Sequence, residues 1–393
     1  MPFDRSVFTL LVLLFGALYL LLWRRRRSDR TSPRVDPFFA FLIAAERATS
    51  SWRRKEVSVA WKRRETELAT RLVIPFYPRD IDTVDLVAKA RGRRIPVRRY
   101  LPPGSGRRPV IVYFHGGGWV TGSIETHDGL CRGLAASSGC AVLSVEYSLA
   151  PEARFPTPIQ EGTAVLEWLA DRGASPELDA SRIILGGDSA GAAIAAALCI
   201  HLRDLRYARL PPIAAQVLFV PATDLSRFDT ESYRTFGEGY MLTERDIRWF
   251  RDQYLRDLSD AYDPLASPLR AASLAGLPPA FIASAGLDPL SSDGEQYAKR
   301  LREAGVPVEF IKVPGVVHAF IGVPTRPGRE TLARAGAWIA ATLGLPTVRR
   351  KSGHDRTQGQ RPRPSIKSRL AKRARTTGAA GDDDAAPWKR RNR

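Results

Sequence analysis

The stretch ILGGDSAGAAIAAAL, residues Ile184–Leu198, has the pattern of a buried β-strand that turns sharply into an alanine-rich helix. Gly187 and Gly191 flank Ser189 in a Gly-x-Ser-x-Gly pattern, and glycine lets the backbone close tightly on both sides of such a bend. The serine would then stand on a strained turn at the end of a sheet, as in a nucleophile elbow. The alternative is a glycine-rich turn with no catalytic role, and the rest of the sequence is needed to choose between the two interpretations.

Strand-like and helix-like segments alternate through the centre of the chain, which predicts an α/β fold with a mostly parallel, eight-stranded sheet flanked by helices. Expected strands cover 83–88, 95–101, 109–118, 140–147, 182–188, 215–221, 280–286 and 308–314. Expected helices cover 127–138, 157–171, 189–204, 292–305 and 327–343. Two segments lie outside this alternation. Residues 37–71 are helical in pattern, and the aromatic-rich insertion 225–263 predicts a lid over a pocket, with simple packing of an extra helix pair as the alternative.

The net charge of +19 is concentrated at the two ends of the 393-residue chain. Residues 24–65 carry a net charge of +8 and residues 349–393 a net charge of +11, whereas residues 66–348 are neutral. No specific binding of nucleic acid is therefore expected of the central body. The tail 347–393 has almost no large apolar residues and is predicted to be disordered, with electrostatic binding to anionic lipid or nucleic acid as the alternative.

A 17-residue run without charge, Val7–Trp23, is followed at once by four arginines, Arg24–Arg27. The run is just long enough to span a membrane, and basic residues collect on the cytoplasmic side of such spans. A cleaved signal peptide carries its charges before the apolar run. The sequence therefore predicts a single-pass anchor in residues 1–27 with a cytoplasmic catalytic body, and a signal peptide or a buried helix is the alternative.

Metal binding is not expected from the composition. Cys131, Cys140 and Cys199 lie among apolar or small residues, without a Cys-x-x-Cys pair or a Cys/His cluster. Such cysteines are typical of buried free thiols.

Three polar residues follow expected strands in the order Ser189, Asp288, His318. The carboxyl ends of parallel strands form the usual ligand-binding edge of an open sheet. A serine hydroxyl becomes a nucleophile when a histidine takes its proton, and a carboxylate orients that histidine. His127, at an expected helix start, and His201, near a helix end, are not expected to be the base.

The segment HGGGW, His115–Trp119, follows another strand and predicts an oxyanion-binding loop. Its glycines leave backbone N–H groups accessible, and the N–H of Ala190 would join them. A phosphate-binding loop is the alternative, but no Gly-Lys-Ser/Thr or Gly-x-Gly-x-x-Gly spacing is present. His115 is expected to shape the loop and not to act as a base.

Five segments together resemble the hormone-sensitive lipase-like branch of the α/β-hydrolases. They are HGGGW, VEYSLAPE (Val145–Glu152), GDSAG, DPL and VVHAF, in that order. The resemblance implies an α/β-hydrolase catalytic domain over 80–346, with a cap built from 28–79 and the insertion at 225–263. It also implies a serine carboxylesterase for short acyl esters that needs no metal or cofactor.

The same resemblance implies roles for individual residues. Ser189 would be the nucleophile, Asp288 the acid and His318 the base, with oxyanion donors at Gly117, Gly118 and Ala190. Asp188 and Glu152 would tie the elbow to the loop that begins with His115 and Gly116. One departure is that Ser291 and Ser292 follow DPL where the family usually has an Arg-Asp pair.

Two other activities, amide deacetylation and lactone hydrolysis, would use the same three residues. A non-catalytic receptor for small molecules is a remote alternative, because such receptors are expected to have lost one of the three. A scaffold that binds lipid or nucleic acid through its basic ends would be at most a secondary role.

Overall fold

The computed structural model describes residues 35–49, 58–73, 78, 80–172, 175–206 and 209–346. The chain divides into two units, Met1–Val348 and Arg349–Arg393, and the second unit lies outside the described residues. The predicted anchor in Val7–Trp23 also lies outside them. Among the helices that are described, none combines the length and the apolar character needed to cross a membrane.

An eight-stranded sheet forms the centre of the first unit, as the sequence predicted. Its order is β1-β2-β4-β3-β5-β6-β7-β8; β1 pairs antiparallel with β2 and β2 with β4, and the remaining pairs are parallel. The strands are β1 Asp82–Ala90, β2 Arg93–Leu101, β3 Arg108–Phe114, β4 Ala141–Val145, β5 Leu178–Asp188, β6 Ala215–Phe219, β7 Ala280–Leu287 and β8 Val308–Val317.

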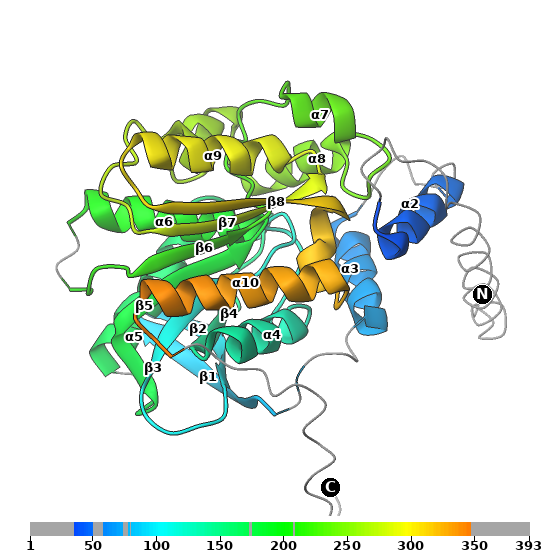
Figure 1. Cartoon of the computed structure of the whole chain (residues 1–393). Helices are drawn as coiled ribbons and strands as arrows, with labels where there is room; N and C mark the ends of the chain where they lie inside the picture. Colours follow the sequence, from blue (N-terminus) through cyan, green and yellow to red (C-terminus); the bar gives the residue numbers. More distant parts are fainter. Residues whose placement is uncertain are drawn as a thin grey trace, which may run out of the picture. The chain divides into compact units, whose positions relative to one another are not determined.

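Helices cover both faces of this sheet, and Figure 1 shows α9 and α10 on opposite sides of it. The apolar side chains of α5, α6 and α9 belong to one buried cluster, and those of α2, α4 and α10 to another. These helices are α2 Pro37–Thr49, α4 Asp128–Ser138, α5 Thr157–Arg172, α6 Ala190–Asp204, α9 Ser291–Glu303 and α10 Arg326–Thr342.

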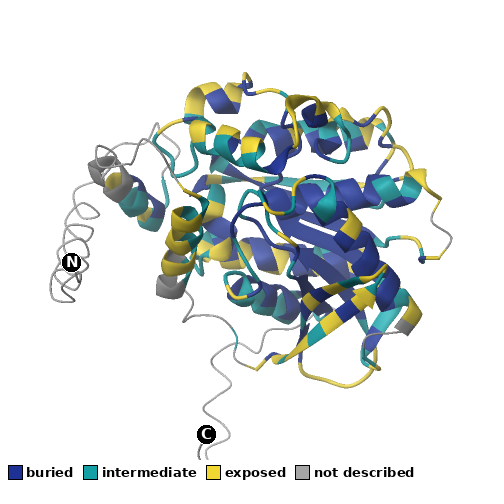
Figure 2. Cartoon of the chain, turned by 180° about the vertical axis from the view of Figure 1, so that it is seen from behind, coloured by how far each residue is buried: buried dark blue, intermediate teal, exposed yellow. Residues whose placement is uncertain are grey.

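Burial explains why these segments form strands. Every residue of β4 and β6 is buried, as expected for central strands covered on both faces. The edge strand β1 instead has mostly exposed or partly buried residues, and Ala88 is its one buried position. Figure 2 shows the buried strands in dark blue, beneath helices that are partly exposed.

Several strand ends differ from the sequence prediction, and two of the differences position functional residues. β3 ends at Phe114, so the following glycines form a loop and not the end of a strand. β8 continues through Pro314 and Gly315 to Val317. It is an edge strand, where proline costs no ladder hydrogen bond if its nitrogen faces outward. His318 therefore follows the strand directly.

The cap segments contain further helices. The N-terminal segment supplies α2 and α3, Val59–Val73, and the insertion supplies α7, Glu231–Phe236, α8, Glu244–Tyr254, and a short 3-10 helix, Leu258–Tyr262. α8 begins with a capping box in which Thr243 and Asp246 each satisfy a backbone N–H of the other. The division into a cap, residues 28–79 and 225–263, and a catalytic domain over 80–346 remains a prediction.

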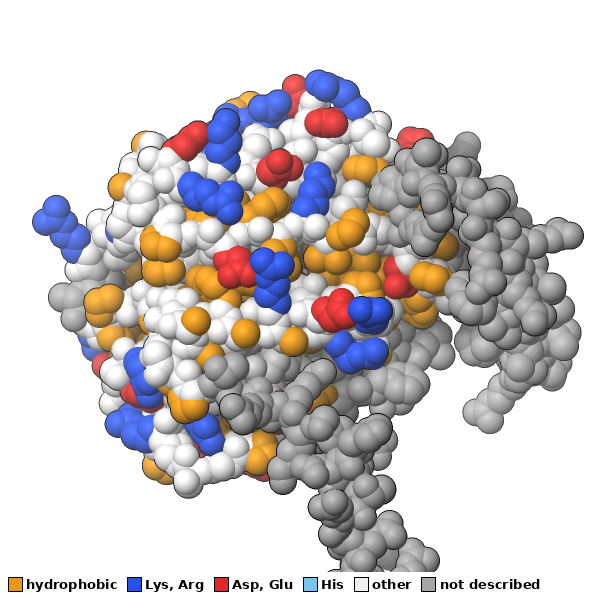
Figure 3. All heavy atoms as spheres, viewed as in Figure 1, with side chains coloured by type: hydrophobic (Ala, Val, Ile, Leu, Met, Phe, Trp, Pro, Cys, Tyr) orange, Lys and Arg blue, Asp and Glu red, His pale blue; other side chains and the backbone are white. Residues whose placement is uncertain are grey.

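The three cysteines are buried free thiols, which confirms the sequence interpretation. Burial raises the pKa of Cys140 to about 11, so this thiol stays protonated at neutral pH. On the face seen in Figure 3, basic and acidic side chains lie interspersed, in keeping with the neutral charge of residues 66–348.

Candidate active site

The turn between β5 and α6 holds Ser189 in a strained conformation, with φ 53° and ψ −118°. Few residues other than glycine adopt such a positive φ. A Cβ at Gly191 would overlap the carbonyl oxygen of Phe114, and one at Gly187 would overlap the backbone of Gly191. The two glycines therefore let the helix approach the neighbouring strand closely enough to make this turn.

Ser189 is the first member of a hydrogen-bonded chain of three side chains. Its Oγ lies 2.8 Å from Nε2 of His318, and Nδ1 of His318 lies 2.8 Å from Oδ2 of Asp288. The Asp288 side chain is fully buried, and its Oδ1 accepts the backbone N–H of Leu290 at 2.9 Å. A carboxylate can only accept here, so Nδ1 carries a proton and Nε2 is free to accept one from Ser189.

The charge of Asp288 tunes the histidine. Burial by itself would lower the pKa of His318, but the negative charge of Asp288 and the hydrogen bond between them outweigh burial. The pKa of His318 is therefore raised above its usual value. A stronger base results, which is suited to taking the proton of a hydroxyl group.

The glycine loop after β3 carries the expected oxyanion donors. Gly117 has φ +117° and Gly118 has φ +61°, both in the region that favours glycine. The carbonyl of Gly117 accepts the N–H of Thr121 at 2.9 Å, which closes the loop into a turn. Among the described residues, the N–H groups of Gly117, Gly118 and Ala190 donate to no protein acceptor. They are thus open to an oxygen of a substrate.

Asp188 links the elbow to this loop, as the resemblance implied. Its Oδ1 accepts the N–H of Gly116 at 3.1 Å and the hydroxyl of Tyr113 at 2.7 Å. A Cβ at Gly116 would overlap the carboxylate of Asp188, so the loop can approach this closely only with glycine there.

His115 has the surroundings of a structural residue. Its ring is fully buried and stacks on Tyr147 with centroids 4.3 Å apart, and Nδ1 lies 2.8 Å from the carbonyl of Gly116. Burial lowers its pKa to about 3, so the ring is neutral.

Glu152 lies elsewhere than the resemblance implied. Its side chain is 64% exposed and pairs with Arg63 of α3 at 2.7 Å, and within the described part of the chain no hydrogen bond joins it to the elbow. Arg63 also donates to the carbonyls of Val120, at 2.9 Å, and Ala150, at 3.0 Å. Glu152 therefore holds the cap helix α3 against the residues that follow the glycine loop.

The residues after DPL bind the segment that follows β6 and the cap insertion. Thr223 and Asp224 donate their backbone N–H groups to Oδ2 of Asp293, at 3.0 and 3.1 Å. Burial raises the pKa of Asp293 well above its usual value. Ser292 accepts the N–H of Ser232 at 3.3 Å and so connects α9 with the cap insertion.

Two cap residues near the site were not singled out by the sequence. Arg63 contacts residues far along the chain, and no local pattern marks it. Phe250 of α8 lies over the glycine loop, because a Cβ at Gly118 would overlap its ring. The aromatic composition of the insertion was the only signal for Phe250. Within the described residues, no group of three His, Cys, Asp or Glu side chains could hold a metal ion.

Comparison with known proteins agrees with this geometry. A family model described as the alpha/beta hydrolase fold matches residues 111–322. Carboxylic ester hydrolase LipN of Mycobacterium tuberculosis is 44% identical over 247 residues, and the match covers 62% of this chain and 65% of that protein. An arylesterase of Saccharolobus solfataricus is 37% identical over 259 residues, covering 66% of this chain and 83% of the arylesterase.

A solved structure is similar over its whole length. It is an ester hydrolase from the metagenome of Lake Arreo, complexed with a derivative of bipyridine phosphonate. It has 37% sequence identity and a TM-score of 0.73, and the match covers 79% of this chain and 100% of that one.

Proposed function

The chain belongs to the α/β-hydrolase fold family, in its hormone-sensitive lipase-like branch, and is a carboxylic ester hydrolase; from this premise we propose that it acts through an acyl-enzyme on Ser189. The observation that carries the proposal is the continuous hydrogen-bonded chain from Ser189 through His318 to Asp288. We further propose that its substrates are esters with short acyl chains.

In the first half of the reaction, Ser189 attacks the ester carbonyl carbon while Nε2 of His318 takes the hydroxyl proton. The carbonyl oxygen becomes negatively charged and accepts hydrogen bonds from the N–H groups of Gly117, Gly118 and Ala190. Asp288 stabilises the imidazolium that forms. The tetrahedral intermediate collapses when the C–O bond of the alcohol breaks, and His318 gives its proton to the departing alkoxide.

In the second half, water attacks the acyl-enzyme. His318 takes a proton from the water, the same three N–H groups bind the new oxyanion, and the proton returns to Oγ of Ser189 as the acid leaves. Each proton transfer is thus assigned to His318, water or substrate. An amide or a lactone could follow the same steps, and these remain the alternative substrates.

The cap supports the proposed limit on acyl length. Phe250 packs against Gly118, which is one of the proposed oxyanion donors. A ring at this position restricts the space beside the carbonyl group of the substrate. Small acyl groups are therefore expected to fit better than long ones.

The test is a panel of p-nitrophenyl esters of increasing acyl length, with matched anilides and lactones, assayed on the full chain. An active-site-directed phosphonate should label Ser189 alone, as located by mass spectrometry. Ser189→Ala should lose both labelling and at least about 10⁴-fold in kcat. Labelling at another residue, or full activity of the variant, would disprove the acyl-enzyme on Ser189.

A further inference from the structure

A second histidine–carboxylate pair lies beside the elbow, separate from the proposed triad. Nε2 of His127 is 3.3 Å from Oδ2 of Asp188, and both side chains are largely buried. Asp188 directly precedes Ser189 in the chain. His127 was not expected from the sequence to take part in turnover.

The two ring nitrogens of His127 have different neighbours: Nδ1 faces the hydroxyl of Thr126, and Nε2 faces the carboxylate of Asp188 and the backbone N–H of Gly116. Nδ1 lies 2.8 Å from Oγ1 of Thr126. That hydroxyl donates its own proton to the carbonyl of Ser123 at 2.9 Å and accepts the N–H of Ser123 at 2.8 Å. Since the Thr126 proton is already committed, Nδ1 is best served by carrying a proton. The N–H of Gly116 has a closer acceptor in Oδ1 of Asp188, at 3.1 Å, so Nε2 can carry a proton and donate it to Oδ2 of Asp188. The surroundings therefore fit a doubly protonated imidazolium.

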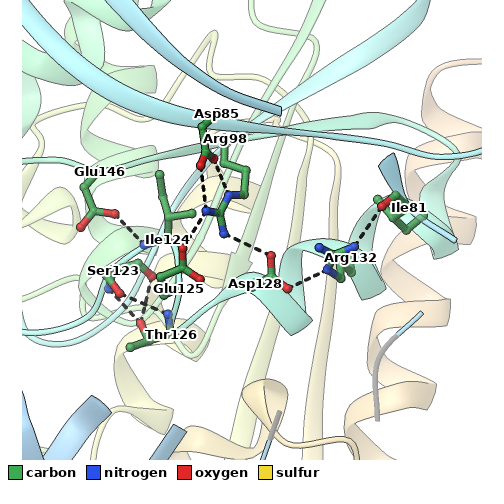
Figure 4. A network of polar contacts seen from close by, with 10 residues as sticks. All are labelled: Ile81, Asp85, Arg98, Ser123, Ile124, Glu125, Thr126, Asp128, Arg132 and Glu146. Atoms are coloured by element: carbon green, nitrogen blue, oxygen red, sulfur yellow. Dashed lines mark hydrogen bonds and ion pairs between the residues drawn. The ribbon is translucent and has the colours of Figure 1, made fainter. Parts of the chain in front are cut away.

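Ion pairs with two arginines hold the turn that carries His127. Figure 4 shows Arg98 of β2 reaching across to the turn, where it pairs with Glu125 at 2.6 Å and with Asp128 at 3.5 Å. Arg132 binds the other oxygen of Asp128 at 2.6 Å. The residues next to His127 are thus held by side chains from the sheet and from α4, which limits the movement of its ring.

On its inner side, the pair reaches the glycine loop. Oδ1 of Asp188 accepts the N–H of Gly116, and this N–H also lies 3.3 Å from Nε2 of His127. Gly116 immediately precedes Gly117, a proposed oxyanion donor. A shift of the carboxylate would therefore shift the start of the loop.

We propose that His127 is a positioning residue that, as an imidazolium, holds Asp188 and through it the start of the oxyanion loop. The inference rests on the proposed function, since the loop matters only if an oxyanion forms there. It also revises the expectation from the sequence, in which His127 had no part in turnover.

The charged surroundings favour this state of the ring. The titratable groups that face His127 from other elements are Asp188 at the end of β5, Glu146 after β4 and His115 after β3, with Tyr113 bonded to Asp188. Burial opposes the charge on His127, but Asp188 and Glu146 raise its pKa above the usual value. His115 is neutral, because burial and the charge of His127 lower its pKa to about 3.

The kinetic test compares His127→Ala, His127→Gln and a control, His201→Ala, in the full chain. The amide of Gln can donate to Asp188 in place of Nε2, whereas His201 lies on α6 away from this pair. We expect His127→Ala to lower kcat at least tenfold with KM within threefold, and His127→Gln to restore most of the loss. Wild-type kcat in His127→Ala, or equal loss in both His127 variants, would overturn the proposal.

A second measurement needs no folded variant of His127. Histidine labelled with ¹³C at Cε1 reports the protonation of each ring by NMR, and variants at the other four histidines assign the fifth signal. We expect His127 to stay charged at pH values where an exposed histidine has become neutral. A neutral ring at pH 6 would refute the imidazolium. An inactive chain with a charged His127 would instead disprove the proposed function.

Discussion

Changing Gly118 to alanine tests whether the cap helix α8 sets the position of the oxyanion loop. Gly118→Ala keeps the backbone N–H, so any loss of activity has to come from a displaced donor. The added Cβ would overlap the ring of Phe250, and the residue has φ +61°. The left-handed conformation costs an alanine about 1–2 kcal/mol, and overpacking costs about 1–3 kcal/mol more.

The cost of the backbone conformation and the cost of overlap can be separated by removing the ring of Phe250. In Gly118→Ala the loop or α8 has to move, and loss of one oxyanion donor lowers kcat about 10²- to 10³-fold. In the double variant Gly118→Ala/Phe250→Ala only the cost of the backbone conformation remains. We therefore expect the double variant to recover at least tenfold in kcat over Gly118→Ala, which is a coupling of about 1.4 kcal/mol or more.

The assay is kcat and KM for a short p-nitrophenyl ester, with melting temperatures to confirm folding. Trp249→Ala is the matched control, since Trp249 is the neighbour of Phe250 on α8 and packs edge-on against its ring. It should give no rescue of Gly118→Ala. If Phe250→Ala and Gly118→Ala simply multiply in their effects on kcat, the argument that Phe250 bears on the loop is refuted.

The remaining predictions concern the triad, its pH dependence and the N-terminus. His318→Ala and Asp288→Asn should each lower kcat by at least about 10³-fold, with His201→Ala near wild type; a dead His201→Ala beside an active His318→Ala would reverse the assignment. Protonated His318 cannot accept the Ser189 proton, and its pKa is raised above 6.5. We therefore expect kcat/KM to fall as pH drops, with a midpoint above 6.5. A midpoint below 6.5 would contradict the coupling of His318 to Asp288. The full chain should sediment with membranes and resist a 1 M salt wash if Val7–Trp23 is an anchor, because salt releases only surface-bound protein; release by salt would contradict the anchor.

The order of strands and helices could be predicted because each segment has a simple apolar pattern. Central strands such as β4 and β6 are continuous apolar runs, and helices such as α6 are rich in alanine. The end of β8 could not be predicted, because Pro314 normally ends a strand. Proline is acceptable there because β8 lies at the edge of the sheet and its pairing with β7 shifts register between Val313 and Val317. Neither the strand order nor the register shift is visible in one sequence.

The contacts of the cap were also beyond prediction, for a different reason. Arg63 and Glu152 are 89 positions apart, and neither lies in a pattern that requires the other. The pairing of the partly buried Arg63 with the exposed Glu152 depends on where α3 lies over the body. Such pairs contribute little to stability and leave little trace in the local sequence. The resemblance therefore suggested a role for Glu152 that the contacts do not support.

The two histidine–aspartate pairs around Ser189 show what distinguishes a base from a fixed cation. His318 and His127 each face a carboxylate with one nitrogen and a hydroxyl with the other. The hydroxyl of Ser189 has its proton available for His318, so that ring can accept it. The hydroxyl of Thr126 gives its proton to the carbonyl of Ser123, so the ring of His127 has to donate. The order of residues along the chain was enough to predict the pair His318–Asp288. The proposed role of the pair His127–Asp188 in holding the loop depends on the hydrogen bonds of the Thr126 hydroxyl, which the sequence does not reveal.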